Sequence, residues 1–195
     1  MNFLAHLYLS GNNPEVRLGN FIGDHVKGSK FTHYPPETQK GIKLHRAIDS
    51  VTDSHPSTRA CSSIFKPAYK RYSGVVCDVV FDHVLAREWS HYSSSNLNEF
   101  TQIFYTQMLQ RYQLLPSSVQ QFLPNMIRTN RLSSYQTSEG VREALDIMSF
   151  RTSLPNNTEY AIEQLRNHYS QFFDYFHSLF GDLIQLATVE FGINL

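Results

Sequence analysis

Apolar residues recur at helical spacings of three and four along nearly the whole chain, and no stretch alternates apolar and polar residues as a strand does. This pattern predicts an all-α fold. A cap residue, Asn13, precedes a first-turn proline, and Pro56 disfavours helical geometry at His55. Together these signals predict a short helix before Pro67 and longer helices over residues 13–28, 37–51, 74–92, 97–113, 117–130, 138–149 and 158–190.

The chain has the size and composition of one folded unit. Its 195 residues, 41% hydrophobic and 17% charged, suit a single core, and no segment has the composition of a linker. We therefore predict one helical bundle spanning residues 1–195, with the aromatic run of residues 172–180 in its core. The opening lacks a signal peptide's basic leader, no run is long enough to span a membrane, and two unpaired cysteines suit a reducing compartment, so a cytoplasmic location is expected.

Charge is unevenly distributed although the formal net charge is zero. Between Arg17 and Arg71, ten Lys or Arg residues face four Asp or Glu residues, which leaves +6 on this segment. A basic segment on a neutral protein indicates a local anionic partner rather than general affinity for nucleic acid.

Two predicted helices carry ionisable residues on faces that border the core. Over residues 37–51 the apolar stripe runs beside His45, Asp49 and, if the helix continues, Asp53. Over residues 74–92, Asp78 and Asp82 interrupt an apolar stripe, and His83 follows directly. A carboxylate at a core position costs several kcal/mol unless a cation, hydrogen bonds or solvent compensate it.

His6 and Asp24 bring the number of such residues in the first 83 positions to eight, on four segments. A single buried histidine or aspartate is usually a paired structural group, but eight at helical spacings indicate a shared site. Carboxylate and imidazole ligands without thiolate suit Mg²⁺ or Mn²⁺, with iron or cobalt as alternatives. Such a site can activate water against a phosphate ester, and the sequence contains no competing phosphate loop or Gly-x-Ser-x-Gly motif.

Four blocks of sequence resemble the acyl carrier protein phosphodiesterases, in that family's order and spacing. The resemblance ends near Trp89, and covers nearly half of the chain. The blocks are MNFLAHL at residues 1–7, GNFIGDHVKG at 19–28, GIKLHRAIDSVTD at 41–53 and DVVFDH at 78–83.

The family is similar to a divergent branch of the HD-type metal phosphohydrolases. The resemblance therefore implies an HD-domain-like helical fold, a divalent cation that is commonly Mn²⁺, and hydrolysis of the phosphodiester that joins 4′-phosphopantetheine to a serine of holo-acyl carrier protein. The product is the apo carrier protein. The usual HD signature is His followed by Asp, whereas the adjacent pair here is Asp82-His83.

The resemblance also implies roles for the ionisable residues. Asp24 is the first choice for the essential acid, as a metal ligand or as the group that positions water, and His45 and Asp82 are the other catalytic candidates. The expected metal ligands are Asp24, His45, Asp49, Asp82 and His83, and the expected orienting side chains are His6, Asp53 and Asp78.

An acidic carrier protein as substrate gives the basic segment a role, because its recognition helix would favour a basic face. The candidate docking residues are Lys27, Lys30, Lys43, Arg46 and Arg59. No nucleic-acid or membrane partner is expected.

Three other readings remain open at this point. The same metal site could act on a nucleotide or another small phosphate ester, since related folds host many such reactions. An inert helical module could bind carrier protein without any metal requirement. A di-iron oxygenase is disfavoured because the sequence lacks the Glu-x-x-His pairs of four-helix di-iron sites.

Overall fold

The computed structural model describes all 195 residues, and its regular elements are all helical, which confirms the predicted all-α class. Short 3₁₀ segments and one π segment connect or extend the α-helices: η1 (Gly23–His25), η2 (Gly28–His33), η3 (Lys70–Tyr72), η4 (Tyr112–Leu114) and η5 (Leu186–Glu190). The α-helices are α1 (Phe3–Tyr8), α2 (Pro14–Phe21), α3 (Pro36–Ser54), α4 (Pro56–Tyr69), α5 (Ser73–Arg87), α6 (Trp89–Tyr92), α7 (Leu97–Gln110), α8 (Ser117–Arg128), α9 (Arg131–Ser134), α10 (Ser138–Arg151), α11 (Thr158–Asn167) and α12 (Tyr169–Gln185). None of them has both the length and the apolar character needed to cross a bilayer.

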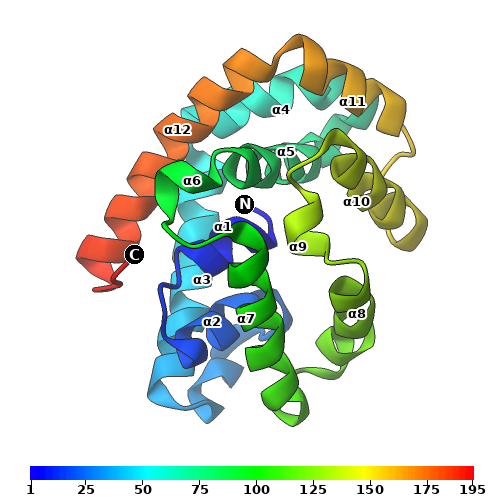
Figure 1. Cartoon of the computed structure of the whole chain (residues 1–195). Coiled ribbons are helices and arrows are strands. Elements are labelled where there is room, and N and C mark those ends of the chain that lie inside the picture. Colours follow the sequence, from blue (N-terminus) through cyan, green and yellow to red (C-terminus); the bar gives the residue numbers. More distant parts are fainter.

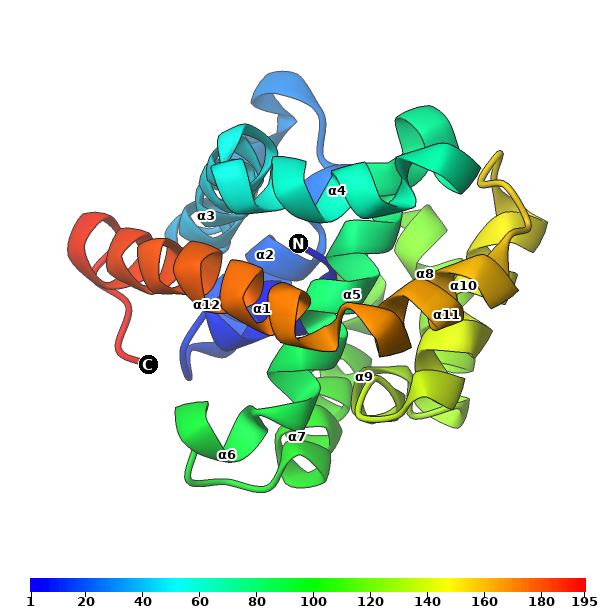
Figure 2. The same cartoon turned by 90° about the horizontal axis from the view of Figure 1, so that it is seen from above.

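The boundaries differ from the sequence prediction at two informative places. The predicted helix over 13–28 ends at Phe21, where the chain tightens into η1. The predicted helix over 158–190 divides at His168, whose φ of −120° and ψ of 19° are not helical. Helix α12, which begins after this break, packs against α4 and α5 (Figure 2).

Helix α5 lies at the centre of the bundle, with α1, α4, α10 and α12 packed around it (Figure 1). From Val76 to Ala86 only Asp78 is not fully buried. The predicted aromatic core stripe is confirmed on α12, where Phe172, Phe176 and Phe180 are all completely buried.

Helices α2 and α3 approach each other unusually closely because two glycines face each other across the contact. A Cβ atom on Gly19 would lie 2.0 Å from the carbonyl oxygen of Thr38, and one on Gly41 would lie 2.2 Å from that of Val16. Any larger residue at either position would push the helices apart. This approach sets the distance between the side chains that α2 and α3 present to α1.

Candidate metal centre

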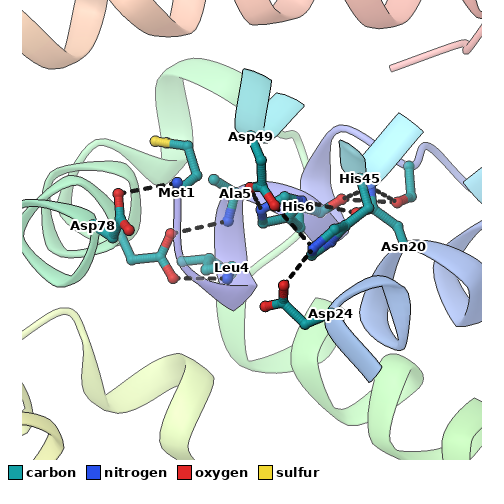
Figure 3. Close-up of polar contacts among 11 residues, drawn as sticks. Met1, Leu4, Ala5, His6, Asn20, Asp24, His45, Asp49 and Asp78 are labelled. Atoms are coloured by element: carbon teal, nitrogen blue, oxygen red, sulfur yellow. Dashed lines mark hydrogen bonds and ion pairs between the residues drawn. The ribbon is translucent and has the colours of Figure 1, made fainter. Parts of the chain in front are cut away.

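Three side chains from two helices meet at the edge of the core (Figure 3). His6 comes from α1, and His45 and Asp49 lie one turn apart on α3. The Asp49 carboxylate bridges the two rings: its Oδ1 lies 3.2 Å from His6 Nε2, and its Oδ2 lies 3.1 Å from His45 Nε2. The rings are stacked with their centroids 4.3 Å apart. The arrangement places two imidazole nitrogens and a carboxylate around one point.

Asn20, buried on α2, orients both imidazole rings. Its Nδ2 donates to the carbonyl of His6 at 2.8 Å and to Ser10 Oγ at 2.9 Å, so its Oδ1 faces the rings and can only accept. His6 Nδ1 lies 2.8 Å and His45 Nδ1 lies 3.2 Å from this oxygen. Both Nδ1 atoms must therefore carry a proton, which leaves Nε2 as the atom of each ring that can bind a metal once it is deprotonated.

A fourth group, Asp24, lies at the solvent side of the cluster. It belongs to η1, and its Oδ1 is 3.4 Å from His45 Nε2 while its side chain remains 72% exposed. The neighbouring residue, Gly23, has no side chain, and this lets Asp24 lie beside His45. A Cβ atom on Gly23 would lie 2.3 Å from the His45 ring. The tightening of the chain after α2 thus places an exposed carboxylate beside a buried imidazole.

The electrostatics leave the cluster with a net negative charge. Burial disfavours the charged form of His45, but the nearby carboxylates of Asp24 and Asp49 outweigh it and raise its pKa to about 9. Burial lowers the pKa of His6. The nearby His45 lowers the pKa of Asp24. Burial alone would raise the pKa of Asp49, but the two nearby histidines lower it. Two carboxylates are thus ionised against one imidazolium.

These residues fit a divalent cation. One ligand atom from each of His6, His45 and Asp49 can lie within 4.8 Å of the others. The Nε2 atom of His45 is buried and has no hydrogen bond of good geometry, although carboxylates surround it. A cation that displaced its proton would satisfy this nitrogen and offset the excess negative charge. Imidazole and carboxylate donors suit Mn²⁺, iron, cobalt or zinc.

The structure brings Asp24, His45 and Asp49 together, as the sequence predicted. His6 was expected to orient the ligands, yet its Nε2 lies as close to Asp49 as that of His45 does. Asn20 was missed, although the sequence carried a signal: Asn20 and Asp24 are four residues apart on a predicted helix.

Two of the predicted metal ligands, Asp82 and His83, lie apart from this cluster. Asp82 is completely buried in α5 and accepts the backbone N–H groups of Leu4 at 2.8 Å and Ala5 at 3.1 Å. These hydrogen bonds from the start of α1 offset part of the cost of its burial. His83 is bonded instead to the carbonyl of Tyr135, with Nδ1 donating at 2.6 Å.

The two remaining predicted acids are also separate from the cluster. Asp78 Oδ1 lies 3.0 Å from the backbone amino nitrogen of Met1 (Figure 3). Asp53 is exposed at the end of α3 and lines a polar surface hollow together with Arg59 and Lys66. Neither acid contacts His6, His45 or Asp49, so neither orients these side chains directly.

The predicted docking residues lie on the surface, but some of them also make contacts within the protein. Lys43 and Arg46 of α3 both lie over the Phe31 ring of η2, at 5.4 Å and 5.0 Å from its centre. Arg46 also donates to the carbonyls of Val26 and Gly28, so it holds the loop that follows Asp24. The exposed members of the set are Lys27, Lys30, Lys43 and Arg59.

Comparison with known proteins relates the chain to one group. The family model described as acyl carrier protein phosphodiesterase matches residues 1–183. The acyl carrier protein phosphodiesterase of Yersinia pestis is 31% identical over 191 residues, covering 96% of this chain and 97% of the relative. The protein of that name from Pectobacterium atrosepticum is 29% identical over 97% of this chain and 99% of its own length. The one from Serratia proteamaculans is 39% identical over 62% of this chain and 63% of its own length. No solved structure gives a significant match.

Proposed function

The chain belongs to the acyl carrier protein phosphodiesterase family, and from that premise we infer that it is a phosphodiesterase that removes the 4′-phosphopantetheine arm from holo-acyl carrier protein. One water is consumed. Its oxygen joins phosphorus, the bond from phosphorus to the carrier's serine oxygen breaks, and that serine oxygen takes up a proton to become a hydroxyl. The products are apo carrier protein and 4′-phosphopantetheine.

The observation that carries the mechanism is the cluster of His6, His45 and Asp49. We propose that their three ligand atoms hold a divalent cation, with Mn²⁺ as the first candidate. Such an ion, when bound, lowers the pKa of water and offsets charge on the phosphoryl oxygens. Asn20 supports this use of the site, since it keeps both Nδ1 atoms protonated and both Nε2 atoms available.

Asp24 has the position of the group that handles the attacking water. Its carboxylate is ionised, largely exposed, and 3.4 Å from His45 Nε2. A substrate phosphate that approached the cluster from solvent would meet this carboxylate first. We propose that Asp24 orients the water and accepts its proton, while His6, His45 and Asp49 stay buried and fixed.

The carrier protein docks, in this proposal, on the exposed cations around α3 and η2. Lys27, Lys30 and Lys43 lie on segments that follow Asp24 or precede His45. An acidic partner held there would bring its modified serine toward the cluster, and the attraction would speed encounter more than it tightens the complex. A cytoplasmic location remains a prediction from the sequence.

The decisive experiment compares substrates and metal states. Purified protein is incubated with holo carrier protein or with a panel of nucleotides, after chelator treatment and with or without added Mn²⁺. Intact-mass measurement should show loss of the complete phosphopantetheine group from the carrier only with Mn²⁺. Hydrolysis of nucleotides with the carrier left intact would instead favour a small-molecule phosphohydrolase, and carrier binding without turnover would indicate an inert binding module.

A further inference from the structure

An apolar cavity of about 330 Å³ lies between α8 and α10, with Arg131 of α9 in its wall. Seven of its twelve lining residues are hydrophobic, and they include Phe122 of α8 and Met148 of α10. The volume falls within the range of small-molecule pockets, which are mostly apolar with a few placed polar groups. The functions described above assign no role to this cavity.

The cavity adjoins the metal centre through two of its lining residues. Phe3 lies one turn before His6 on α1, and His25 directly follows Asp24 in η1. Both rings pack against Phe122, at centroid distances of 5.9 Å. A molecule whose phosphate reached the cluster could therefore continue past Phe3 and His25 into the cavity.

One nitrogen of a buried cation at the cavity wall, Arg131 Nη2, lacks a hydrogen-bond partner. The Arg131 side chain is only 9% exposed; its Nη1 donates to the carbonyl of Gly140 at 3.3 Å and lies 3.7 Å from Glu143. Its Nη2 is buried without any hydrogen bond. A buried donor left unpaired costs about 1–3 kcal/mol, so this nitrogen is suited to an acceptor on a ligand.

We propose that this cavity binds the pantetheine arm of the substrate, an inference that rests on the proposed function. The arm carries a dimethyl group, two amides and a terminal thiol, and it leaves the phosphate as an extended chain. Its apolar atoms pack against Phe122 and Met148, and an amide carbonyl accepts from Arg131 Nη2. The cavity thus selects the arm, while the surface cations select the carrier protein.

The test fills the cavity without touching the cluster. Met148 is only partly buried, so Met148→Trp places bulk in the cavity at limited cost to folding. The control is Phe150→Trp, since Phe150 is on the same helix but 91% exposed. We expect Met148→Trp to lower kcat/KM for holo carrier protein about tenfold. A small steric misfit between a substrate and an apolar pocket typically has an effect of this size. Hydrolysis of bis(p-nitrophenyl) phosphate, which has no such arm, should be unchanged in both variants.

A binding measurement separates this proposal from the proposed function. Free pantetheine is titrated calorimetrically into the wild type, Met148→Trp and Arg131→Met, each checked by its melting temperature. Binding should be weakened in both cavity variants and kept in Phe150→Trp. Equal pantetheine binding and equal holo-carrier turnover in all folded variants would overturn the cavity assignment. If the wild type bound pantetheine but left holo carrier protein intact, the proposed function would fail and the cavity assignment would stand.

Discussion

Asn20 decides which nitrogen of each histidine can bind a ligand. Without its oxygen, the Nδ1 atoms of His6 and His45 would lose their acceptor, and either ring could rotate or change tautomer. Groups that orient metal ligands in this way typically contribute 10–100-fold to metal affinity. We therefore expect Asn20→Ala to weaken Mn²⁺ binding by about that factor. Calorimetric titration with Mn²⁺ measures this loss, and Asn98→Ala, at an exposed position, is the control. Equal Mn²⁺ affinities in the wild type and Asn20→Ala would show that Asn20 does not orient the two rings.

Asp24 is mostly exposed, so its replacement should separate chemistry from stability. Asp24→Ala should reduce kcat on holo carrier protein by about 10²–10⁴-fold, the range of general acid–base contributions. Its melting temperature should stay close to that of the wild type because the Asp24 side chain is mostly exposed and Asp49 still faces the buried His45. A variant that kept near-normal turnover would show that another group handles the water.

His83 gives the protein a specific sensitivity to acid. Burial lowers the pKa of His83 to about 4, below the 6.5 of a free histidine. Between these values this histidine is protonated in the unfolded chain but not in the folded protein. The free energy of unfolding therefore falls as pH drops through this window. From pH 6.5 to about 4.5 the expected loss is about 2 kcal/mol from this residue.

Urea unfolding of the wild type and His83→Gln at both pH values measures this contribution. Asp82 acts in the opposite direction, because burial raises its pKa to about 7 and its protonation favours the folded state as pH falls. That effect is present in both proteins and cancels in the comparison. The acid-induced loss should be smaller in His83→Gln, and parallel pH profiles would contradict the assignment.

At the residue scale, the sequence revealed some members of the site but not their roles. His45 and Asp49 were predictable because a spacing of four on one helix places them side by side. Asp24 was singled out by the family resemblance. The position of His6 depends on how α1 crosses α3, which no local sequence pattern specifies. Asn20 is uncharged, so its type alone does not mark it as a site residue.

At the element scale, the contact between α2 and α3 holds the site together. Gly41→Ala would place a Cβ atom 2.2 Å from the Val16 carbonyl oxygen, and so should separate the helices and shift Asn20 relative to His45. Overpacking of this kind costs about 1–3 kcal/mol. We expect that loss in urea unfolding together with weaker Mn²⁺ binding.

Gly181→Ala in α12 is the matched control for that substitution. A Cβ atom there would meet no atom within 4 Å, so the variant should keep its metal affinity and gain slightly in stability from better helix propensity. If Gly41→Ala behaved like Gly181→Ala, the close approach of α2 and α3 would not be needed for the site.

Helix α5 shows why the surroundings of Asp82 and His83 depend on tertiary packing. Its residues from Val79 to Ala86 are buried all round, so an apolar stripe on it has no unique direction. The sequence correctly indicated that Asp82 needs compensation for its burial. It could not distinguish a cation from the N–H groups at the start of α1, because that choice depends on tertiary packing.

At the scale of the whole molecule, the basic segment predicts salt-dependent recognition. Exposed charges are screened over roughly 10 Å at 0.1 M ionic strength, so KM for holo carrier protein should rise with added NaCl while kcat changes little. Lys30→Glu and Lys43→Glu should raise KM at low salt and flatten this dependence. Arg166→Glu, an exposed charge reversal on α11, should leave both unchanged. A KM that did not vary with salt would contradict docking on these cations.

The most direct test of the metal centre is Mn²⁺ binding followed by electron paramagnetic resonance on chelator-treated protein. The comparison needs three proteins: the wild type, Asp49→Ala, and Asp53→Ala, whose exposed carboxylate lies one turn further along α3. Wild type and Asp53→Ala should bind Mn²⁺ alike, and Asp49→Ala should lose that binding. Undiminished binding in Asp49→Ala would contradict a metal centre formed by His6, His45 and Asp49.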